Sequence, residues 1–271
     1  MTVRTEKKGL VWTVIHDRPQ ARNAMDPDSA DALNAAFLAF DTDESASVAV
    51  FYGEGGAFCA GWDLKFVSTL NADYPLGELD IPPAKPRGNG GDIPRGPMGP
   101  SRLELDKPVI AAIEGPAVAG GMELALWCDF RVMAEDAYLG VYCRRWGVPL
   151  IDGGTVRLPR IVGQGRALEI ILTGRKVPAE ECLAIGLCEY VTSKGGARAK
   201  AEALAQEIAR FPQVCARADR RSAIKNQGLS VRDGLIQEWY NGREALIKDG
   251  VAGATRFKDG LGRHGDFAKI K

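Results

Sequence analysis

The sequence is poor in the residues that build metal sites and membrane spans. It has only two histidines among 271 residues, His16 and His264, which leaves little material for a zinc site, so we expect no bound metal. No apolar run approaches the roughly 18 residues of a membrane-spanning helix, and the N-terminal MTVRTEKKGL has no apolar signal core. We therefore expect no membrane association and a cytoplasmic location.

Paired cysteines are also missing. The six cysteines are scattered along a large chain, and none of them forms a C-x-x-C pair. We expect reduced thiols rather than a disulfide framework, which again fits the cytoplasm. The cysteines are Cys59, Cys128, Cys143, Cys182, Cys188 and Cys215.

Neither sign of charge is in excess. The 35 basic residues balance 35 acidic ones, so no chain-wide affinity for nucleic acid is expected. The G-x-S-x-G motif of serine hydrolases and the Walker A motif are absent. Residues 260–265 match G-x-G-x-x-G, but they follow a helical region and open no βαβ unit, so we interpret this match as accidental.

Strand and helix patterns alternate in the first part of the chain. Short apolar runs predict strands over residues 11–15, 48–52 and 109–113. An amphipathic pattern predicts a helix over residues 29–40. This alternation is typical of an α/β fold.

The last quarter of the chain predicts helices only. Strongly helix-forming segments cover residues 197–210, 214–226 and 231–248. We therefore divide the chain into a core, residues 1–195, and a C-terminal helical region, residues 196–271.

The core contains one long irregular segment, residues 68–102. Proline and glycine crowd its residues 71–100, which cannot hold a regular element for long. Long loops inside compact domains are commonly lids or binding loops. We expect a lid near a substrate, and a plain variable insertion is the alternative.

The most informative stretch is KPVIAAIEGPAVAGGMELALWCDF, residues 107–130. An apolar strand meets a Gly-Pro turn, and Gly120 and Gly121 then open a helix. The first N–H groups of a helix have no intrahelical partner, and they favour an oxygen that carries developing negative charge. Glu123 lies in the same first turn, so a carboxylate would stand beside these donors.

A second segment has the same organisation. The strand at residues 48–52 is followed by the turn Gly-Glu-Gly-Gly and by AFCAGWDLK, residues 57–65. Two loops can therefore each offer a backbone N–H to one anion.

These two loops resemble the oxyanion-hole segments of the enoyl-CoA hydratase/isomerase (crotonase) superfamily. The resemblance extends to residues 16–25, 153–160 and 172–175 and covers nearly the whole chain except residues 68–102. It implies an α/β, crotonase-like spiral of repeated strand-strand-helix units. It also implies that the C-terminal helices pack between subunits of a homotrimer or of a dimer of trimers.

The resemblance assigns roles in the site. It implies that the backbone N–H groups of Trp62 and Gly120 hold a thioester oxygen, and that Glu123 moves a proton. The alternative for Glu123 is simple stabilisation of the helix dipole. The second catalytic glutamate of the hydratases corresponds to Cys143, and a thiol is a poorer proton acceptor at neutral pH.

Two further features near Cys143 leave alternatives open. Asp152 lies one residue from the place of a catalytic aspartate in some members, but an aspartate before Gly-Gly-Thr is also a common turn or cap residue. Arg144 and Arg145 either recognise a second carboxylate of the substrate or are solvated or ion-paired.

The expected coenzyme A contacts come from the first part of the chain. Arg18 and Arg22 match a segment near the CoA phosphates, and Lys65 follows the first oxyanion loop near the adenine pocket. Surface solvation is the alternative for all three. Residues expected beside them are Ala60, Asp63 and Leu64, with Phe257 and Lys258 of a neighbouring subunit as weaker candidates.

We therefore expect an enzyme that acts on an acyl-CoA thioester, with CoA as part of the substrate and no further cofactor. Enoyl-CoA hydration is the first choice. Enoyl-CoA isomerisation, or dehydration of a hydroxyacyl-CoA, would suit a single glutamate. A non-catalytic protein that binds acyl-CoA or RNA is the alternative from another class.

Overall fold

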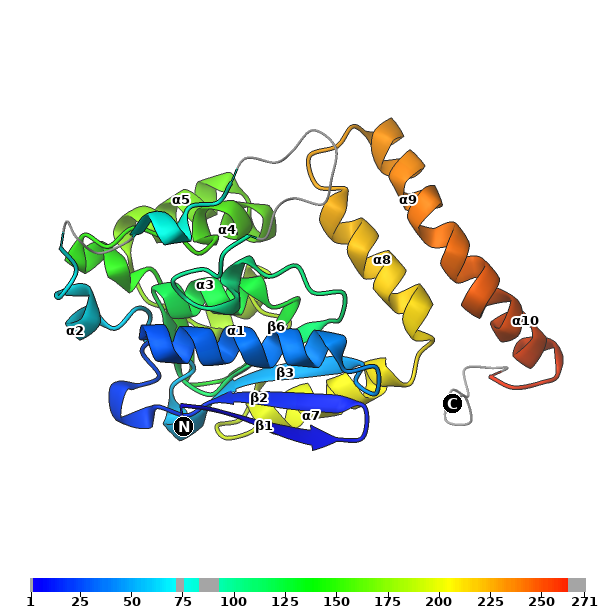
Figure 1. Ribbon diagram of the computed structural model, residues 1–271, viewed down its shortest axis with the longest axis horizontal. Coiled ribbons are helices and arrows are strands. Elements are labelled where there is room, and N and C mark those ends of the chain that lie inside the picture. Colours follow the sequence, from blue (N-terminus) through cyan, green and yellow to red (C-terminus); the bar gives the residue numbers. More distant parts are fainter. Residues whose placement is uncertain (1, 72–75, 83–92, 263–271) are drawn as a thin grey trace.

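The computed structural model describes residues 2–71, 76–82 and 93–262 (Figure 1). Its main sheet has six strands in the order β1-β2-β3-β4-β6-β9. β1 and β2 are antiparallel, and the other neighbours are parallel. The strands are β1 (Val3–Lys8), β2 (Val11–His16), β3 (Val48–Gly53), β4 (Val109–Ile113), β6 (Phe130–Ala134) and β9 (Tyr190–Thr192).

A smaller sheet lies beside the main one and has the order β5-β7-β8. Its strands are β5 (Pro116–Val118), β7 (Tyr138–Gly140) and β8 (Val177–Pro178). The three strands expected from the sequence are confirmed, each with the same first residue as its prediction and two of them one residue longer. An α/β architecture is confirmed with them.

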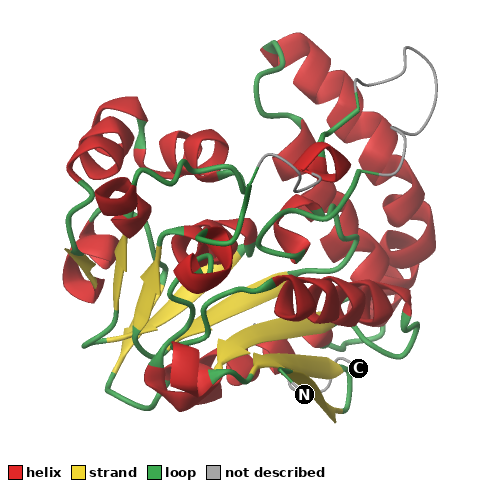
Figure 2. Ribbon diagram, turned by 60° about the vertical axis from the view of Figure 1, so that its left-hand side comes forward, coloured by secondary structure: helices red, strands yellow, loops and turns green. Residues whose placement is uncertain are grey.

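Helices cover both faces of the main sheet, as Figure 2 shows. The helices of the core are α1 (Pro27–Thr42), α2 (Leu64–Val67), α3 (Gly120–Trp127), α4 (Gly154–Val162), α5 (Gln164–Thr173), α6 (Ala179–Ala184) and α7 (Ala197–Ala209). The helix expected at residues 29–40 is α1, which is two residues longer at each end. It begins earlier because Asp26 caps it and Pro27 occupies its first turn.

The two faces of the sheet follow from the period of two in each strand. In β3, Val48 and Val50 belong to the group of buried apolar side chains on one face of the sheet, whereas Ala49 and Phe51 belong to the group on the other face. α7 covers the first face with Ala197, Ala201, Ala205 and Ala209, whose small side chains allow close approach. α7 comes after residue 195, where the core was expected to end, but it packs against the sheet. The helices that stand apart from the sheet therefore begin with α8.

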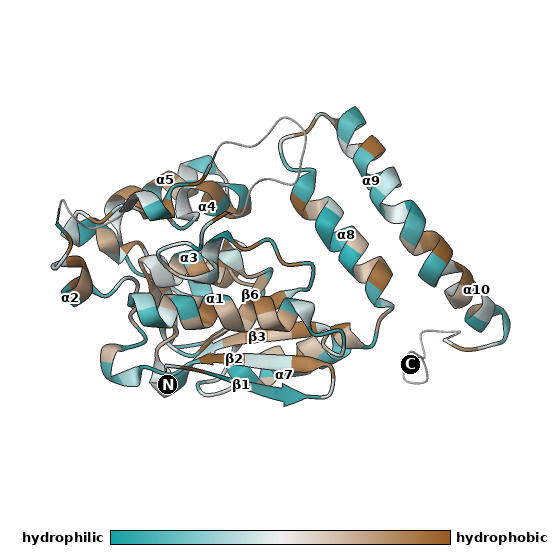
Figure 3. Ribbon diagram, viewed as in Figure 1, coloured by the Kyte–Doolittle hydropathy of each residue, from teal (hydrophilic) through white to brown (hydrophobic). Residues whose placement is uncertain are grey.

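The C-terminal region is helical as expected. It consists of α8 (Gln213–Lys225), α9 (Val231–Ala245), a π-helical turn (Leu246–Gly250) and α10 (Val251–Lys258). α8 lies between the core and α9, and α9 and α10 extend away from the sheet (Figure 1). Several large apolar side chains on these helices are exposed, and Figure 3 shows the corresponding hydrophobic positions.

The described part of the irregular segment 68–102 is not uniformly exposed. Its first residue, Ser68, is the C-cap of α2, and Leu76–Leu79 forms a short 3₁₀ helix, but the end of the segment is built into the core. Met98 and Ser101 are each 1% exposed. Residues 72–75 and 83–92 of the expected lid lie outside the described residues, as does the end of the G-x-G-x-x-G match at residues 263–265.

No helix in the described ranges has the length and apolar character needed to cross a membrane. All six cysteines carry free thiols, and Cys215 is the exposed one.

Candidate active site

The two predicted oxyanion loops are joined by backbone pairing. Cys59 and Ala117 form an isolated parallel bridge, in which Cys59 N–H donates to the Pro116 carbonyl at 3.2 Å and Val118 N–H donates to the Cys59 carbonyl at 3.0 Å. The loops therefore run side by side in the same direction. Trp62 and Gly120 stand at equal offsets from the bridge (59 to 62, 117 to 120), so the pairing brings them together.

Glycine makes this close approach possible. Gly61 has φ +93°, and a Cβ there would lie 2.7 Å from the Cβ of Ala119 and 3.1 Å from the nitrogen of Gly120. A Cβ on Gly121 would overlap the Cys59 carbonyl oxygen. Ala119 itself has φ 54°, a conformation that is costly for alanine, and its N–H donates to the Gly140 carbonyl at 2.8 Å.

The approach to the first loop is fixed by a buried asparagine. Asn23 is fully buried with φ 55°. Its Nδ2 donates to the carbonyls of Glu54 and Ala57 at 2.8 and 2.7 Å, and its Oδ1 accepts the Arg18 N–H at 2.8 Å. These bonds tie the 18–25 segment to the turn that leads into the loop.

The N–H groups of Trp62 and Gly120 are the distinctive donors of this site. Neither donates to any acceptor among the residues that the structure describes. Gly120 is the first residue of α3, where the N–H has no intrahelical partner. Both residues line one cavity.

The cavity has a volume of about 150 Å³. All five residues predicted to be catalytic line it: Trp62, Gly120, Glu123, Cys143 and Asp152. Most of the remaining wall is apolar and includes Leu64, Met98, Tyr142, Trp146, Val148 and Ile151. A larger cavity, of about 720 Å³, lies between α8 and the end of α3 and contains none of the five.

Glu123 has one engaged and one open carboxyl oxygen. It is 2% exposed, and its Oε1 accepts the N–H groups of Asp152 and Gly154 at 2.9 and 2.8 Å. Within the described ranges no group donates to Oε2. Burial, with a contribution from the charge of Asp152, raises the pKa of Glu123 to about 7, against the opposing effect of the two N–H groups. The side chain can therefore accept and return a proton near neutral pH.

Asp152 directs its carboxylate to the end of the irregular segment. Its Oδ1 accepts the Met98 N–H at 3.0 Å and the Ser101 hydroxyl. Burial raises the pKa of Asp152 despite these hydrogen bonds. The residue lines the cavity and also holds neighbouring backbone, so both roles considered for it from the sequence are compatible with its position.

Cys143 lies in a short 3₁₀ helix, Tyr142–Trp146, and is 6% exposed. Burial raises the pKa of its thiol, and the nearby charge of Glu123 adds to the effect. His16 does not line the cavity, and burial lowers its pKa to about 4. The thiol is therefore protonated at neutral pH.

Arg144 and Arg145 are not directed into the cavity wall. The guanidinium of Arg145 stacks over the Tyr142 ring, 3.9 Å from its centroid. Arg144 donates through Nε to the Ile171 carbonyl at 3.4 Å. The structure thus gives both arginines contacts of their own.

The predicted CoA contacts fall into two groups. Arg18 pairs with Asp63 at 2.7 Å and with Asp26 at 3.3 Å, so its charge is already partnered. Ala60 and Leu64 line the cavity, and Lys65 is exposed at the start of α2.

Other predicted contacts lie elsewhere. The side chain of Arg22 makes no hydrogen bond or ion pair within the described ranges. Phe257 and Lys258 end α10, which lies at the opposite end of the molecule from α2 (Figure 1). They are not part of this chain's own cavity.

The sequence did not predict much of the apolar wall. Met98 sits in a proline- and glycine-rich segment, and Val148 and Ile151 lie in a loop without periodic pattern. The only indication in the sequence was that these residues lie close to the matched motifs, which they precede or follow.

Comparisons with known proteins identify the relatives of the chain. A family model described as Enoyl-CoA hydratase/isomerase matches residues 6–75 and 101–232. The chain is 34% identical over 251 residues to enoyl-CoA hydratase EchA19 of Mycobacterium tuberculosis, covering 90% of this chain and 88% of that protein. It is 36% identical over 207 residues to carnitinyl-CoA dehydratase of Salmonella typhi, covering 74% of this chain and 72% of that protein.

Solved structures give the same result. The crystal structure of an enoyl-CoA hydratase from Mycobacterium tuberculosis H37Rv superposes with a TM-score of 0.84 at 30% identity, covering 95% of this chain and 96% of that one. An enoyl-CoA hydratase from Bacillus anthracis gives a TM-score of 0.83 at 29% identity, covering 96% of each chain.

The loop pairing predicts a sharp penalty for a single methyl group. Gly121→Ala should lower the free energy of unfolding by about 1–3 kcal/mol, because the new Cβ meets the Cys59 carbonyl. Gly165→Ala is the matched control, since a Cβ there meets nothing within 4 Å and alanine favours the helix. Urea unfolding of both variants measures the difference, and equal stabilities would contradict the pairing argument.

The raised pKa of Glu123 predicts a pH dependence of stability. The folded protein holds the proton more tightly than the unfolded chain, so stability falls as the pH rises from about 4.5 to about 7. The difference corresponds to roughly 3 kcal/mol at most. Glu123→Gln should lack this loss and should gain on the wild type over that window in unfolding measurements. Parallel pH profiles of the two proteins would show that the carboxyl titrates normally.

Proposed function

Because the chain belongs to the enoyl-CoA hydratase/isomerase family and has the crotonase fold, we propose that its cavity binds an acyl-CoA thioester and moves a proton on the acyl group. The observation that carries the proposal is that the hydrogen-bond donors and the proton-transferring group line the same cavity. Two backbone N–H groups without a protein acceptor and a carboxyl with a pKa of about 7 line one small apolar cavity.

The two N–H groups supply the oxyanion hole in this proposal. The thioester oxygen accepts hydrogen bonds from Trp62 and Gly120 and becomes negative as an enolate forms. Backbone donors that are fixed before the reaction need no reorganisation when the charge develops. The positive end of α3 adds to the effect at Gly120.

Hydration is our first assignment of the reaction. Glu123 takes a proton from water as its oxygen adds to C3 of a 2-enoyl thioester. The electrons of the double bond move toward the thioester carbonyl, so that its oxygen becomes negative. Glu123 then returns its proton to C2 of this enolate, which regenerates the carboxylate. The reverse sequence is dehydration, and the relatives reported above include both a hydratase and a dehydratase.

Isomerisation is the second candidate, and Cys143 favours it. A protonated thiol at this position gives the water no second carboxylate. In isomerisation Glu123 removes a proton from C2 of a 3-enoyl thioester and returns one to C4, so no water needs to be held. A catalytic role for Asp152 stays a prediction.

We propose that coenzyme A runs past the start of α2. Ala60 and Leu64 form that side of the cavity, and Lys65 offers an exposed cation for a phosphate. Arg18 would act by holding Asp63, which caps α2, rather than by touching the ligand. No cofactor beyond the CoA of the substrate is part of the proposal, and a cytoplasmic location is retained with it.

We also propose that the C-terminal helices assemble the chain into a homotrimer or a dimer of trimers. Large apolar side chains on α9 and the following turn are exposed, including Val231 at 81%, Trp239 at 60% and Ile247 at 72%. A second copy would remove this surface from water.

Turnover tests the proposed reaction. In deuterated water, 2-enoyl CoA thioesters should be hydrated with deuterium incorporation at C2, or 3-enoyl CoA thioesters should be isomerised with deuterium incorporation at C4, followed by mass and absorbance. Glu123→Gln should lower the rate by roughly 100- to 10,000-fold, because the amide cannot move the proton. Glu44→Gln is the control, since it makes the same substitution at an exposed glutamate outside the cavity and should leave the rate unchanged. Tight binding of CoA thioesters without any turnover would instead support the non-catalytic alternative.

Light scattering tests the assembly. The wild type should have the mass of three or six chains, and Ile247→Glu should shift it to smaller species because a charge would be buried at the contact. Leu10→Glu, on an exposed turn of the core at 46%, should leave the mass unchanged. A monomeric wild type would refute the assembly and leave the proposed reaction to its own test.

A further inference from the structure

The end of the irregular segment closes the inner side of the cavity. Gly96 and Gly99 exchange backbone hydrogen bonds of 3.0 and 2.9 Å, which makes a tight loop with Met98 inside it. Met98 is 1% exposed, and Leu64, Trp146 and Ile151 of the same cavity are 41%, 67% and 43% exposed. The mouth is therefore at the exposed residues and the floor is at Met98.

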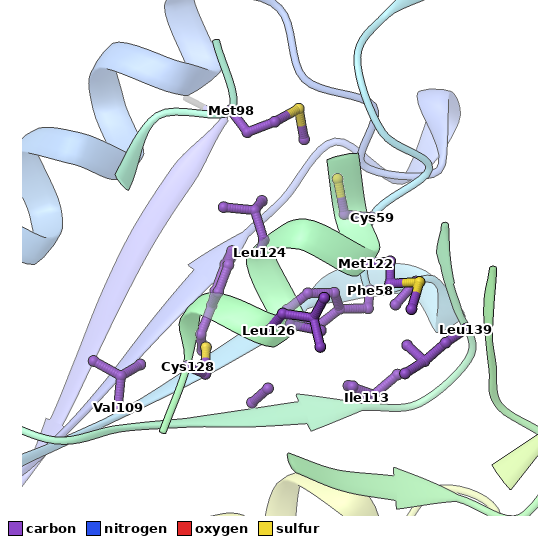
Figure 4. Close-up of a cluster of buried hydrophobic side chains, with 14 of the residues drawn as sticks. Phe58, Cys59, Met98, Val109, Ile113, Met122, Leu124, Leu126, Cys128 and Leu139 are labelled. Atoms are coloured by element: carbon purple, nitrogen blue, oxygen red, sulfur yellow. The ribbon is translucent and has the colours of Figure 1, made fainter. Parts of the chain in front are cut away.

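The Met98 side chain lies directly over Gly120. A Cβ placed on Gly120 would be 2.5 Å from the Met98 sulfur and 2.8 Å from its Cγ. Figure 4 shows Met98 and Cys59 on the opposite side of α3 from Ile113 and Leu139. An acyl group whose carbonyl accepts the Gly120 N–H would thus have its first carbons within reach of this thioether.

A buried polar network holds the segment in place. Asp152 Oδ1 accepts the Met98 N–H and the Ser101 hydroxyl. Arg157 donates to the carbonyls of Asp152 and Ser101 at 2.9 and 2.7 Å. Asp152 and Ser101 are 3% and 1% exposed, so these bonds are protected from water.

We propose that Met98 is a specificity-determining residue that limits the length of the acyl group, and that Asp152 is the positioning residue that fixes Met98 over Gly120. The site then selects CoA thioesters of short acyl groups. This inference rests on the proposed acyl-CoA function. It assigns Asp152 a role that needs only an acceptor oxygen and no change of protonation.

Binding of saturated thioesters tests the role of Met98 without relying on turnover. Calorimetry with butyryl-, hexanoyl- and octanoyl-CoA gives the ratio of dissociation constants for each protein. Met98→Ala should shift this ratio toward the next longer chain by roughly tenfold, since it frees room for about two methylene groups. Met98→Leu fills a similar volume and should keep the wild-type ratio.

Met122→Ala is the matched control for the loss of a buried methionine. Met122 lies in α3, the helix that Gly120 opens, and is also 1% exposed, but it does not line the cavity. It should lower stability and leave the ratio unchanged. An unchanged ratio in Met98→Ala, with binding retained, would overturn the inference while the proposed function stands. A wild type that binds none of the thioesters would overturn both.

Three variants separate positioning by Asp152 from catalysis by it. Asp152→Asn keeps an acceptor oxygen and should retain the wild-type chain-length ratio and turnover within a few-fold. Asp152→Ala and Ser101→Ala should lower the melting temperature. They should also shift the ratio of dissociation constants toward longer chains, as Met98→Ala does. Loss of turnover in Asp152→Asn with the ratio preserved would overturn the positioning role and identify Asp152 as an acid or base.

Discussion

The whole site depends on a single short backbone pairing between Cys59 and Ala117. It is the contact that converts two loops, far apart in the sequence, into one structure with two converging donors. The pairing is made by main-chain groups, so it depends on how closely the two loops can approach. Gly61 and Gly121 allow this approach because they have no Cβ at the contact. Asn23 on one side and the strained Ala119 on the other hold the two loops in that register.

Around this frame the structure creates an unusual carboxyl. Glu123 is buried in an apolar wall with another acid nearby, and both conditions oppose ionisation. Two N–H groups donate to one of its oxygens, and within the described ranges no group donates to the other. Burying this carboxyl destabilises the fold, but it gives the side chain a pKa at which it can exchange a proton near neutral pH.

Strands β2, β3 and β4, helices α1, α3, α7, α8 and α9, and the two donor loops could be predicted because they depend on local patterns: apolar runs, caps and glycine turns. The other strands are mostly short and were not predicted. The grouping of Glu123 with Trp62 and Gly120 also followed from motif resemblance. The contribution of Met98 could not be predicted, because it depends on how an irregular segment returns to the core through Asp152 and Ser101. The partnering of Arg18 with Asp63 was missed for the same reason, since an ion pair across 45 positions leaves no periodic trace.

The use of main-chain donors has a consequence for how this protein can change. Because the proposed anion-stabilising donors are main-chain groups, the residues at positions 98, 143 and 151 can be exchanged while the loop pairing persists, whereas the glycines at 61, 120 and 121 tolerate no such freedom. Chemistry and substrate preference are thus separable from the scaffold. A library of variants at the first set of positions would contain folded proteins with changed preferences, whereas a library at the glycines would contain few folded proteins.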